Sequence, residues 1–358
     1  MRPPTPPARG AGSNPDNRFV AQHIELEPDA LVDDDGNPLP LRTVFLRDDS
    51  QSIISWNDSP DIPFRAGLNP YRGCEHGCAY CYARPTHEYL GFSAGLEFES
   101  RIMVKMRAPE LLRAEFSRKA WKPQTIMMSG VTDCYQPVER RLEITRGCLG
   151  VLAEFRNPVG IVTKNHLVTR DIDHLRELAK FKAAGVGISV TTLDPALAKV
   201  LEPRASTPSR RLAAIEELSA AGIRVRVMVA PVIPGLNDHE IPAILAAAKK
   251  AGARFASYIL LRLPLAVAPV FSEWLELHRP GEKEKILGRI RDLRGGALNV
   301  SKFKERQRGS GDAADQLARL FDVAKRRAGF VDADEPLSAA AFRRVTDQLS
   351  LFDYPSVG

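Results

Sequence analysis

The order of apolar and polar positions divides the chain into an irregular beginning and a longer part with alternating patterns. Up to about residue 66, short apolar pieces are interrupted by turn-forming Asp, Asn, Gly and Pro residues. From about residue 67, apolar runs of strand length alternate with stretches whose apolar residues recur every three or four positions. This alternation predicts an α/β protein with a parallel sheet joined by right-handed helical crossovers.

Six strands and the helices between them follow from this pattern. The predicted strands are 68–73, 101–105, 125–130, 159–164, 187–192 and 225–232. Two of the helices begin with a capping side chain before a proline, at Asp194-Pro195 and Thr207-Pro208, and the second ends at Gly222. Periodicity does not decide whether the sheet curls into a partial barrel or stays an open, doubly wound sheet.

Composition changes across the chain suggest four regions. Residues 1–18 are rich in Pro, Gly and Arg and are expected to form a disordered tail. Residues 19–65 are expected to form a small extension with short strands, and residues 66–300 the core domain. Residues 301–358 are expected to form a basic linker followed by helices at 312–327 and 336–349, the first of which can pack over the open side of a barrel.

Overall composition limits the classes of protein to which this chain can belong. The chain has 358 residues, 44% of them hydrophobic, and no run of 18 apolar residues. It has five cysteines, three of them in one short stretch, which indicates no disulfide framework and favours a reducing, cytoplasmic compartment. The net charge of +6 is compatible with a nucleic-acid partner but is common in proteins of this size.

The strongest chemical signal is the spacing C-x3-C-x2-C of Cys74, Cys78 and Cys81. Three thiolates in so short a loop predict a shared metal centre, because gathering them costs little chain entropy. Gly73 and Gly77 allow the backbone to approach a bulky inorganic group. Three thiolates on a four-iron cube leave one iron open to a substrate or cofactor, unlike a four-cysteine cluster.

A zinc site is the alternative reading of the same stretch. The three cysteines with His76 or His87 would complete four zinc ligands. Structural zinc sites usually have two paired arms, however, and this stretch has one. The functional alternative is accordingly a zinc- or cluster-containing nucleic-acid-binding protein without radical chemistry.

The cysteine spacing, with the aromatic residue that follows it, resembles that of the radical S-adenosylmethionine (radical SAM) superfamily. The stretches GVTDCYQPVE, IVTKN, SVTTLD, EPRASTPSRRL and MVAPVIPGLND further resemble an uncharacterised bacterial group near the spore photoproduct lyases, described as DNA repair photolyases. The resemblance implies a partial (β/α)6 barrel over about residues 66–265, with a short N-terminal extension and a helical C-terminal segment.

The resemblance also implies a reaction and its partners. A [4Fe-4S] cluster held by Cys74, Cys78 and Cys81 would reductively cleave S-adenosylmethionine (SAM) to a 5′-deoxyadenosyl radical. An electron donor such as flavodoxin or ferredoxin would reduce the cluster. The substrate is unidentified, and a nucleic acid is suggested by analogy alone.

Strand ends supply candidates for SAM binding. Lys164, after the fourth predicted strand, is a candidate partner for the SAM carboxylate, as is the lysine in the lyase branch; otherwise it is a surface lysine. Ser189 and Thr191 point to one side of the fifth predicted strand and are candidates for the carboxylate or ribose. The alternative is that neighbouring backbone satisfies both hydroxyls.

Two further cysteines differ in their predicted roles. Cys134 follows the third predicted strand and is a candidate hydrogen-atom donor to a substrate radical; otherwise it is a small buried filler. The lyase donor aligns with Gly130 rather than with Cys134, which counts against lyase activity itself. Cys148 lies in an apolar helical stretch and is predicted to be a structural thiol.

Overall fold

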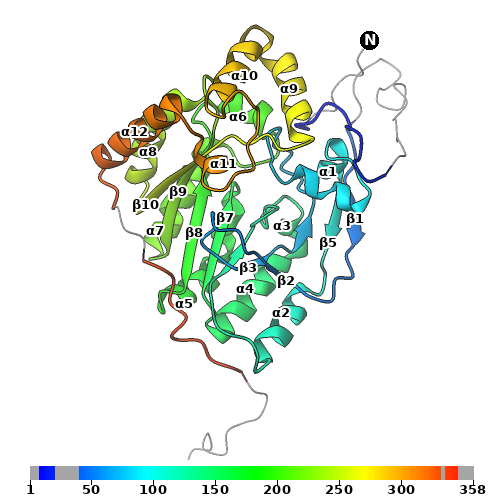
Figure 1. Ribbon diagram of the computed structural model, residues 1–358. Helices are drawn as coiled ribbons and strands as arrows, with labels where there is room; N and C mark the ends of the chain where they lie inside the picture. Colours follow the sequence, from blue (N-terminus) through cyan, green and yellow to red (C-terminus); the bar gives the residue numbers. More distant parts are fainter. Residues whose placement is uncertain (1–7, 21–39, 332–334, 346–358) are drawn as a thin grey trace, which may run out of the picture.

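The computed structural model describes residues 8–20, 40–331 and 335–345. Its main feature is a seven-stranded sheet in the order β10-β9-β8-β7-β6-β3-β2 (Figure 1). Six of its strands, β3, β6, β7, β8, β9 and β10, are parallel, and β2 runs antiparallel to β3. Strands β10 and β2 form the two edges of the sheet. The strands are β2 (Ile54–Trp56), β3 (Ala66–Leu68), β6 (Ile126–Met128), β7 (Val159–Thr163), β8 (Ala184–Ser189), β9 (Arg224–Val232) and β10 (Phe255–Leu260). The sheet is therefore that of an open, partial barrel.

A second, three-stranded sheet corrects two of the predicted strands. It consists of β1 (Val44–Arg47), β5 (Arg101–Val104) and β4 (Tyr71–Arg72) in the order β1-β5-β4. The predicted strand 101–105 therefore forms, but outside the main sheet, whose sixth parallel strand is the unpredicted β10. The predicted strand 68–73 is divided between β3 and β4 around Pro70, which has no N–H for a ladder.

Helices cover the outer face of the main sheet (Figure 1). They are α2 (Ala108–Ser117), α4 (Ile144–Phe155), α5 (Ile172–Ala179), α7 (Pro208–Ala220) and α8 (Ile241–Lys250). Each turns apolar residues inward, such as Phe116, Phe155 and Leu218, all fully buried. The cap at Asp194 is confirmed, since its side chain accepts a hydrogen bond from the amide of Ala196 in α6 (Pro195–Leu201). Gly222 has the left-handed φ of +78° expected after α7.

The remaining helices lie above the carboxyl ends of the strands and beyond β10. They are α1 (Leu96–Ser100), α3 (Glu139–Leu142), α9 (Val267–His278), α10 (Lys283–Asp292), α11 (Glu305–Arg308) and α12 (Asp312–Arg327). Helix α12 packs against α8, and its Phe321 ring lies 4.7 Å from that of Tyr258 in β10. It therefore borders edge strand β10. No helix in the described ranges is long and apolar enough to cross a membrane.

Two terminal expectations differ from the structure. Residues 8–18 are not a loose tail: Arg9, Gly10 and Ala11 are buried against the molecule. The composition did not reveal this because the contacts are made mainly by backbone groups and one arginine. The predicted helix 336–349 is absent over 336–345, which run as irregular chain, and 346–349 lie outside the described residues.

Candidate functional site

The cysteine loop, residues 73–83, borders a cavity at the carboxyl ends of the parallel strands. Its thiols Cys74, Cys78 and Cys81 all line this cavity. The other lining residues are His76, Tyr80, Tyr82, Ser129, Val131, Thr132, Asp133, Val162, Thr163, Lys164, Ala230, Pro231, Ile259, Leu260, Leu261 and Arg262. Most of these residues stand at or just after the ends of β6, β7, β9 and β10. Loops at this end of a parallel barrel carry the functional groups.

The backbone of the loop is fixed by glycines and by hydrogen bonds. Gly73 and Gly77 have φ of +78° and +65°, a region that side chains rarely allow. The amide of Cys74 donates to Phe98 O at 2.9 Å, and the amide of Ala79 donates to Leu201 O at 3.1 Å. The loop is therefore held near its beginning and in its middle by segments distant in sequence.

The three thiols influence one another in the cavity. Burial raises the pKa of Cys74 well above its usual value, and the neighbouring Cys78 and Cys81 raise it further. Burial likewise raises the pKa of Cys78, while the Lys164 ammonium opposes this rise. The thiols are thus favoured in their neutral, protonated form until a bound metal centre displaces their protons.

The geometry of the described residues does not provide the ligands that a single zinc ion would need. Within residues 8–20, 40–331 and 335–345, no three His, Cys, Asp or Glu side chains converge closely enough to hold one metal ion. Both His76 ring nitrogens are engaged, Nδ1 at 3.3 Å from Asp133 and Nε2 at 3.1 Å from Asn165. His87 does not line the cavity.

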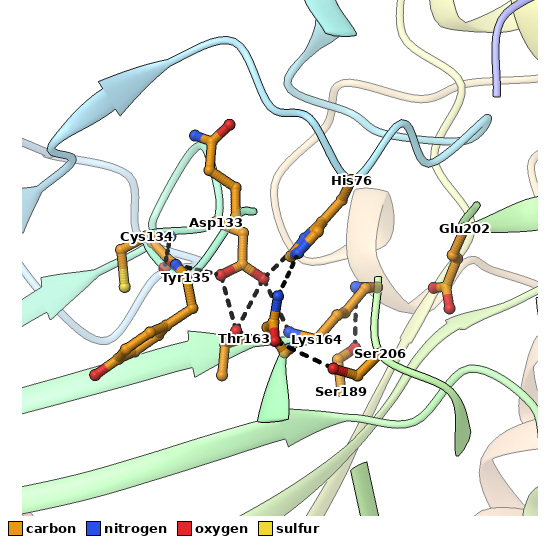
Figure 2. A network of polar contacts seen from close by, with 12 residues as sticks. His76, Asp133, Cys134, Tyr135, Thr163, Lys164, Ser189, Glu202 and Ser206 are labelled. Atoms are coloured by element: carbon orange, nitrogen blue, oxygen red, sulfur yellow. Dashed lines mark hydrogen bonds and ion pairs between the residues drawn. The ribbon is translucent and has the colours of Figure 1, made fainter. Parts of the chain in front are cut away.

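Asp133 ties the cysteine loop to strand β7 (Figure 2). Its carboxylate accepts hydrogen bonds from the Thr163 hydroxyl at 2.8 Å and the Lys164 amide at 2.9 Å. Burial alone would raise the pKa of Asp133, but His76 and these amide contacts lower it to about 2. A charged Asp133 therefore holds His76, which lies between two of the cysteines, against the sheet.

A second buried network anchors the loop at Tyr80. The Tyr80 hydroxyl bonds to the Glu202 carboxylate, which forms an ion pair with Arg211. Glu202 and Arg211 are almost fully buried, and the Arg211 guanidinium also donates to Ser189 O at 3.1 Å. Because a buried charge without its partner is costly, this network fixes the loop relative to β8 and α7.

The three residues predicted to contact SAM differ in whether they line the cavity. The half-buried Lys164 lines the cavity, and its Nζ lies 3.1 Å from Ser189 Oγ. The Ser189 hydroxyl donates to Ala230 O at 2.9 Å, and Thr191 Oγ1 lies 2.6 Å from Glu202 and 3.0 Å from Ala230 O. Ser189 and Thr191 are thus satisfied within the protein and do not line the cavity, whereas Lys164 does.

The structure places Cys134 outside the cavity. Its side chain is fully buried in the main hydrophobic core with Ile144 and Cys148, and Figure 2 shows its sulfur pointing away from His76. The backbone on either side is held by Ser129 Oγ and Thr145 Oγ1. The expected role of hydrogen donor therefore lacks its geometry, because the loop turns the adjacent Asp133 toward the cavity instead. Cys148 is buried in the core, as predicted.

Comparison with known proteins identifies the family. The sequence model described as the radical SAM superfamily matches residues 68–248, about half of the chain. The chain belongs to the radical SAM superfamily. This radical SAM protein is 37% identical to an uncharacterized protein of Mycobacterium bovis over 65% of its own length and 68% of the relative's. It is 31% identical to an uncharacterized protein of Methanocaldococcus jannaschii over 48% of its length and 62% of the relative's.

Solved structures agree on the fold of this radical SAM enzyme. A structure of spore photoproduct lyase complexed with dinucleoside spore photoproduct is similar with a TM-score of 0.51 and 15% sequence identity. The similarity covers 79% of this chain and 78% of the lyase. At this identity the likeness concerns the fold. The family itself implies an iron–sulfur cluster and SAM as cofactors.

Sequence reasoning missed the residues that hold the loop in place. Asp133 and Glu202 both lie in stretches that carried the family resemblance, and Asp133 directly precedes Cys134. The sequence signal available for Asp133 was that of a single carboxylate just after a predicted strand. Nothing in the sequence indicated that Glu202 meets Arg211 and Tyr80, because α6 and α7 bring them together.

Proposed function

We propose that this enzyme binds a [4Fe-4S] cluster through Cys74, Cys78 and Cys81 and reductively cleaves SAM there. When bound, the reduced cluster supplies the electron that splits SAM into methionine and a 5′-deoxyadenosyl radical, which acts on a substrate not yet identified. The observation that carries the proposal is that three thiols, those of the buried Cys74 and Cys78 and the half-buried Cys81, line one cavity with the Lys164 ammonium at the carboxyl ends of the sheet.

The protein's own residues have distinct roles in this proposal. Lys164 binds the SAM carboxylate by a charge-assisted hydrogen bond, and Ser189 fixes the direction of its ammonium. Asp133 and Glu202 hold the loop at His76 and Tyr80, so the thiols keep their spacing whether or not substrate is present. Thr191 and Cys134 have no direct part. An external donor such as flavodoxin or ferredoxin delivers the electron.

An anionic substrate, such as a nucleic acid, is supported by Arg262 at one side of the cavity and by two arginines behind it, Arg294 and Arg306, that do not line the cavity. Arg262 lines the cavity, its guanidinium lies 5.7 Å from the ring of the half-exposed Tyr82, and its Nε has no hydrogen-bond partner among the described residues. Burial and the nearby Arg306 lower the pKa of Arg262. Burial and Arg262 lower the pKa of Arg294 to about 10. Of these three arginines, Arg306 is paired with a carboxylate, that of Asp61.

Three close guanidiniums with one carboxylate repel one another, so an incoming phosphate or carboxylate relieves the repulsion. The exposed Tyr82 ring beside them offers a face on which a base can stack, and its hydroxyl is fixed by Gly130 O at 2.8 Å. Binding of a fluorescent single-stranded oligothymidylate should weaken roughly tenfold in Arg262→Gln. The exposed Arg176→Gln is the control and should bind as wild type. No binding by wild type would argue for a different substrate class.

The test of the proposed reaction is anaerobic reconstitution. Protein reconstituted with iron and sulfide should be brown and, with dithionite and SAM, should form 5′-deoxyadenosine. Anaerobically purified protein that is colourless and holds one zinc per chain would instead support a metal-containing nucleic-acid-binding protein. DNA lesion lyase activity is a separate question, because the lyase's cysteine donor has no counterpart facing this cavity.

A further inference from the structure

Residues 8–18, called here the N-terminal arm, lie against the outside of the cysteine loop. In Figure 1 this dark blue segment runs beside α1 and α9. Ser13 O accepts a hydrogen bond from Leu96 N of α1 at 3.2 Å, and Ser13 Oγ donates to Glu273 of α9 at 2.7 Å. Asn14 Oδ1 accepts from Glu97 N at 3.0 Å. The arm is therefore bound along its length.

The first link between the arm and the loop is the buried carboxylate of Glu99. Its two oxygens accept the amides of Gly10 at 3.0 Å and Ala11 at 2.9 Å. The same carboxylate pairs with Arg84 at 2.5 Å, and neither side chain is exposed. The Arg84 guanidinium in turn donates to Cys78 O at 2.8 Å. A continuous set of charge-assisted hydrogen bonds thus leads from the arm to the backbone of a cluster cysteine.

The second link is direct backbone contact at Gly10. A Cβ atom at this position would lie 1.7 Å from Gly77 O and 3.0 Å from Ala79 N. Both atoms belong to backbone, so a side chain at residue 10 can be accommodated only if the arm or the loop moves. Gly77 stands directly before Cys78, so that movement reaches the proposed cluster ligand.

The third link is Arg9, which is itself buried. Its guanidinium donates to Glu99 O and Leu41 O, both at 2.6 Å, and to Thr43 Oγ1 at 3.0 Å. Arg204 also reaches Thr43 Oγ1, at 3.3 Å, and pairs with Glu75 of the cysteine loop at 2.9 Å. The arm is therefore connected to the loop on both sides of Gly77.

We propose that residues 9–11 are positioning residues of the cluster site. They hold the backbone from Gly77 to Ala79 in the conformation that spaces the cysteines, and they cover that side of the loop from solvent. The identity of the bound group rests on the proposed function, but the effect on the loop does not. Without the arm, the buried Glu99 carboxylate would lose two of its donors, and Arg84, which bonds to Cys78 O, would be paired with a less firmly held carboxylate.

The test compares Gly10→Ala with Gly288→Ala. Each adds one methyl group, but Gly288, in α10, has open space around the added atom. Amide hydrogen exchange is measured on cluster-free protein for peptides that cover residues 73–83. Exchange should be roughly tenfold faster in Gly10→Ala and unchanged in Gly288→Ala, because loop opening should become easier by about the free energy of one charge-assisted hydrogen bond. Unchanged exchange in Gly10→Ala would overturn the proposal.

Iron content provides the second readout. After reconstitution and exposure to a chelator, Gly10→Ala should retain several-fold less iron per chain than wild type. Should circular dichroism show that Gly10→Ala does not fold, Arg9→Met, which keeps the glycine contact, decides by the same two measurements. If wild-type protein binds no cluster but exchange of residues 73–83 is faster in Gly10→Ala, the proposed function is refuted and this inference stands. If wild-type protein binds a cluster but Gly10→Ala matches it in both exchange and iron retention, this inference is refuted and the proposed function stands.

Discussion

The ammonium of Lys164 lies 3.1 Å from the hydroxyl of Ser189, which joins the ends of strands β7 and β8 beside the thiols. Ser189 cannot swing freely, because its hydroxyl is also bonded to Ala230 O at 2.9 Å. The lysine is therefore a pre-positioned cation whose charge reaches the cysteines, where it opposes the rise in the pKa of Cys78 and Cys81. A ligand carboxylate entering the cavity meets a cation already oriented.

Replacing Lys164 should weaken SAM binding without loss of iron. Removing one charge-assisted hydrogen bond costs about 1.5–3 kcal/mol, so Lys164→Met should raise the dissociation constant of SAM roughly ten- to a hundredfold. Equilibrium binding to reconstituted protein measures this effect. Lys180→Met is the matched control, because Lys180 is exposed at the end of α5 and pairs there with the exposed Glu177. An unchanged dissociation constant in Lys164→Met would remove the lysine from the SAM site.

Cys134→Ala should leave chemistry intact and reduce stability. Because the Cys134 side chain is buried in the core and does not line the cavity, the variant should form 5′-deoxyadenosine at the wild-type rate. Its free energy of unfolding in urea should fall by about 1 kcal/mol, as for a small cavity in a core. Cys148→Ala should behave in the same way. Normal SAM cleavage with altered substrate products in Cys134→Ala alone would restore the hydrogen-donor role.

His87 should make the protein sensitive to mild acid. Its ring is fully buried between Phe92 and Phe98, and burial lowers its pKa to about 4. The unfolded chain, with a pKa near 6.5, binds the extra proton first, so stability is lost as pH falls through this window. The loss attributable to His87 should approach about 3 kcal/mol near pH 4.

His87→Leu isolates this contribution, since other groups titrate in both proteins. The difference in unfolding free energy between wild type and His87→Leu should change between pH 7 and pH 4, with wild type losing more. Chemical denaturation of the cluster-free protein at several pH values provides the measurement. Parallel pH profiles for the two proteins would show that His87 is not held neutral in the folded state.

The sequence predicted the cysteine loop, the parallel sheet and the position of Lys164, because these depend on local spacing and on apolar periodicity. It misplaced the strand at 101–105, because periodicity identifies a strand but not the neighbour with which it pairs. It made Cys134 a candidate for the cavity from its position after a strand, with a buried filler as the alternative. Position after a strand does not determine which side chain of the loop turns inward, and Asp133 rather than Cys134 lines the cavity.

The arm was hidden from sequence reasoning for a related reason. Its main contacts are the amides of Gly10 and Ala11, and backbone amides carry no residue-specific signal. Glu99, which receives them, is far along the chain and looks like any acidic residue near the end of a helix. Contacts of this kind become visible only when distant segments are brought together by the fold.

The measurement that tests the central claim most directly is 5′-deoxyadenosine formation by reconstituted protein carrying single cysteine replacements. Wild type and Cys148→Ala should contain about four irons per chain and cleave SAM with dithionite. Cys74→Ala, Cys78→Ala and Cys81→Ala should each lose the cluster absorption and form no product, because two thiolates hold a cube poorly. Retention of cluster and SAM cleavage in Cys74→Ala, or their loss in Cys148→Ala, would contradict the assignment of the site.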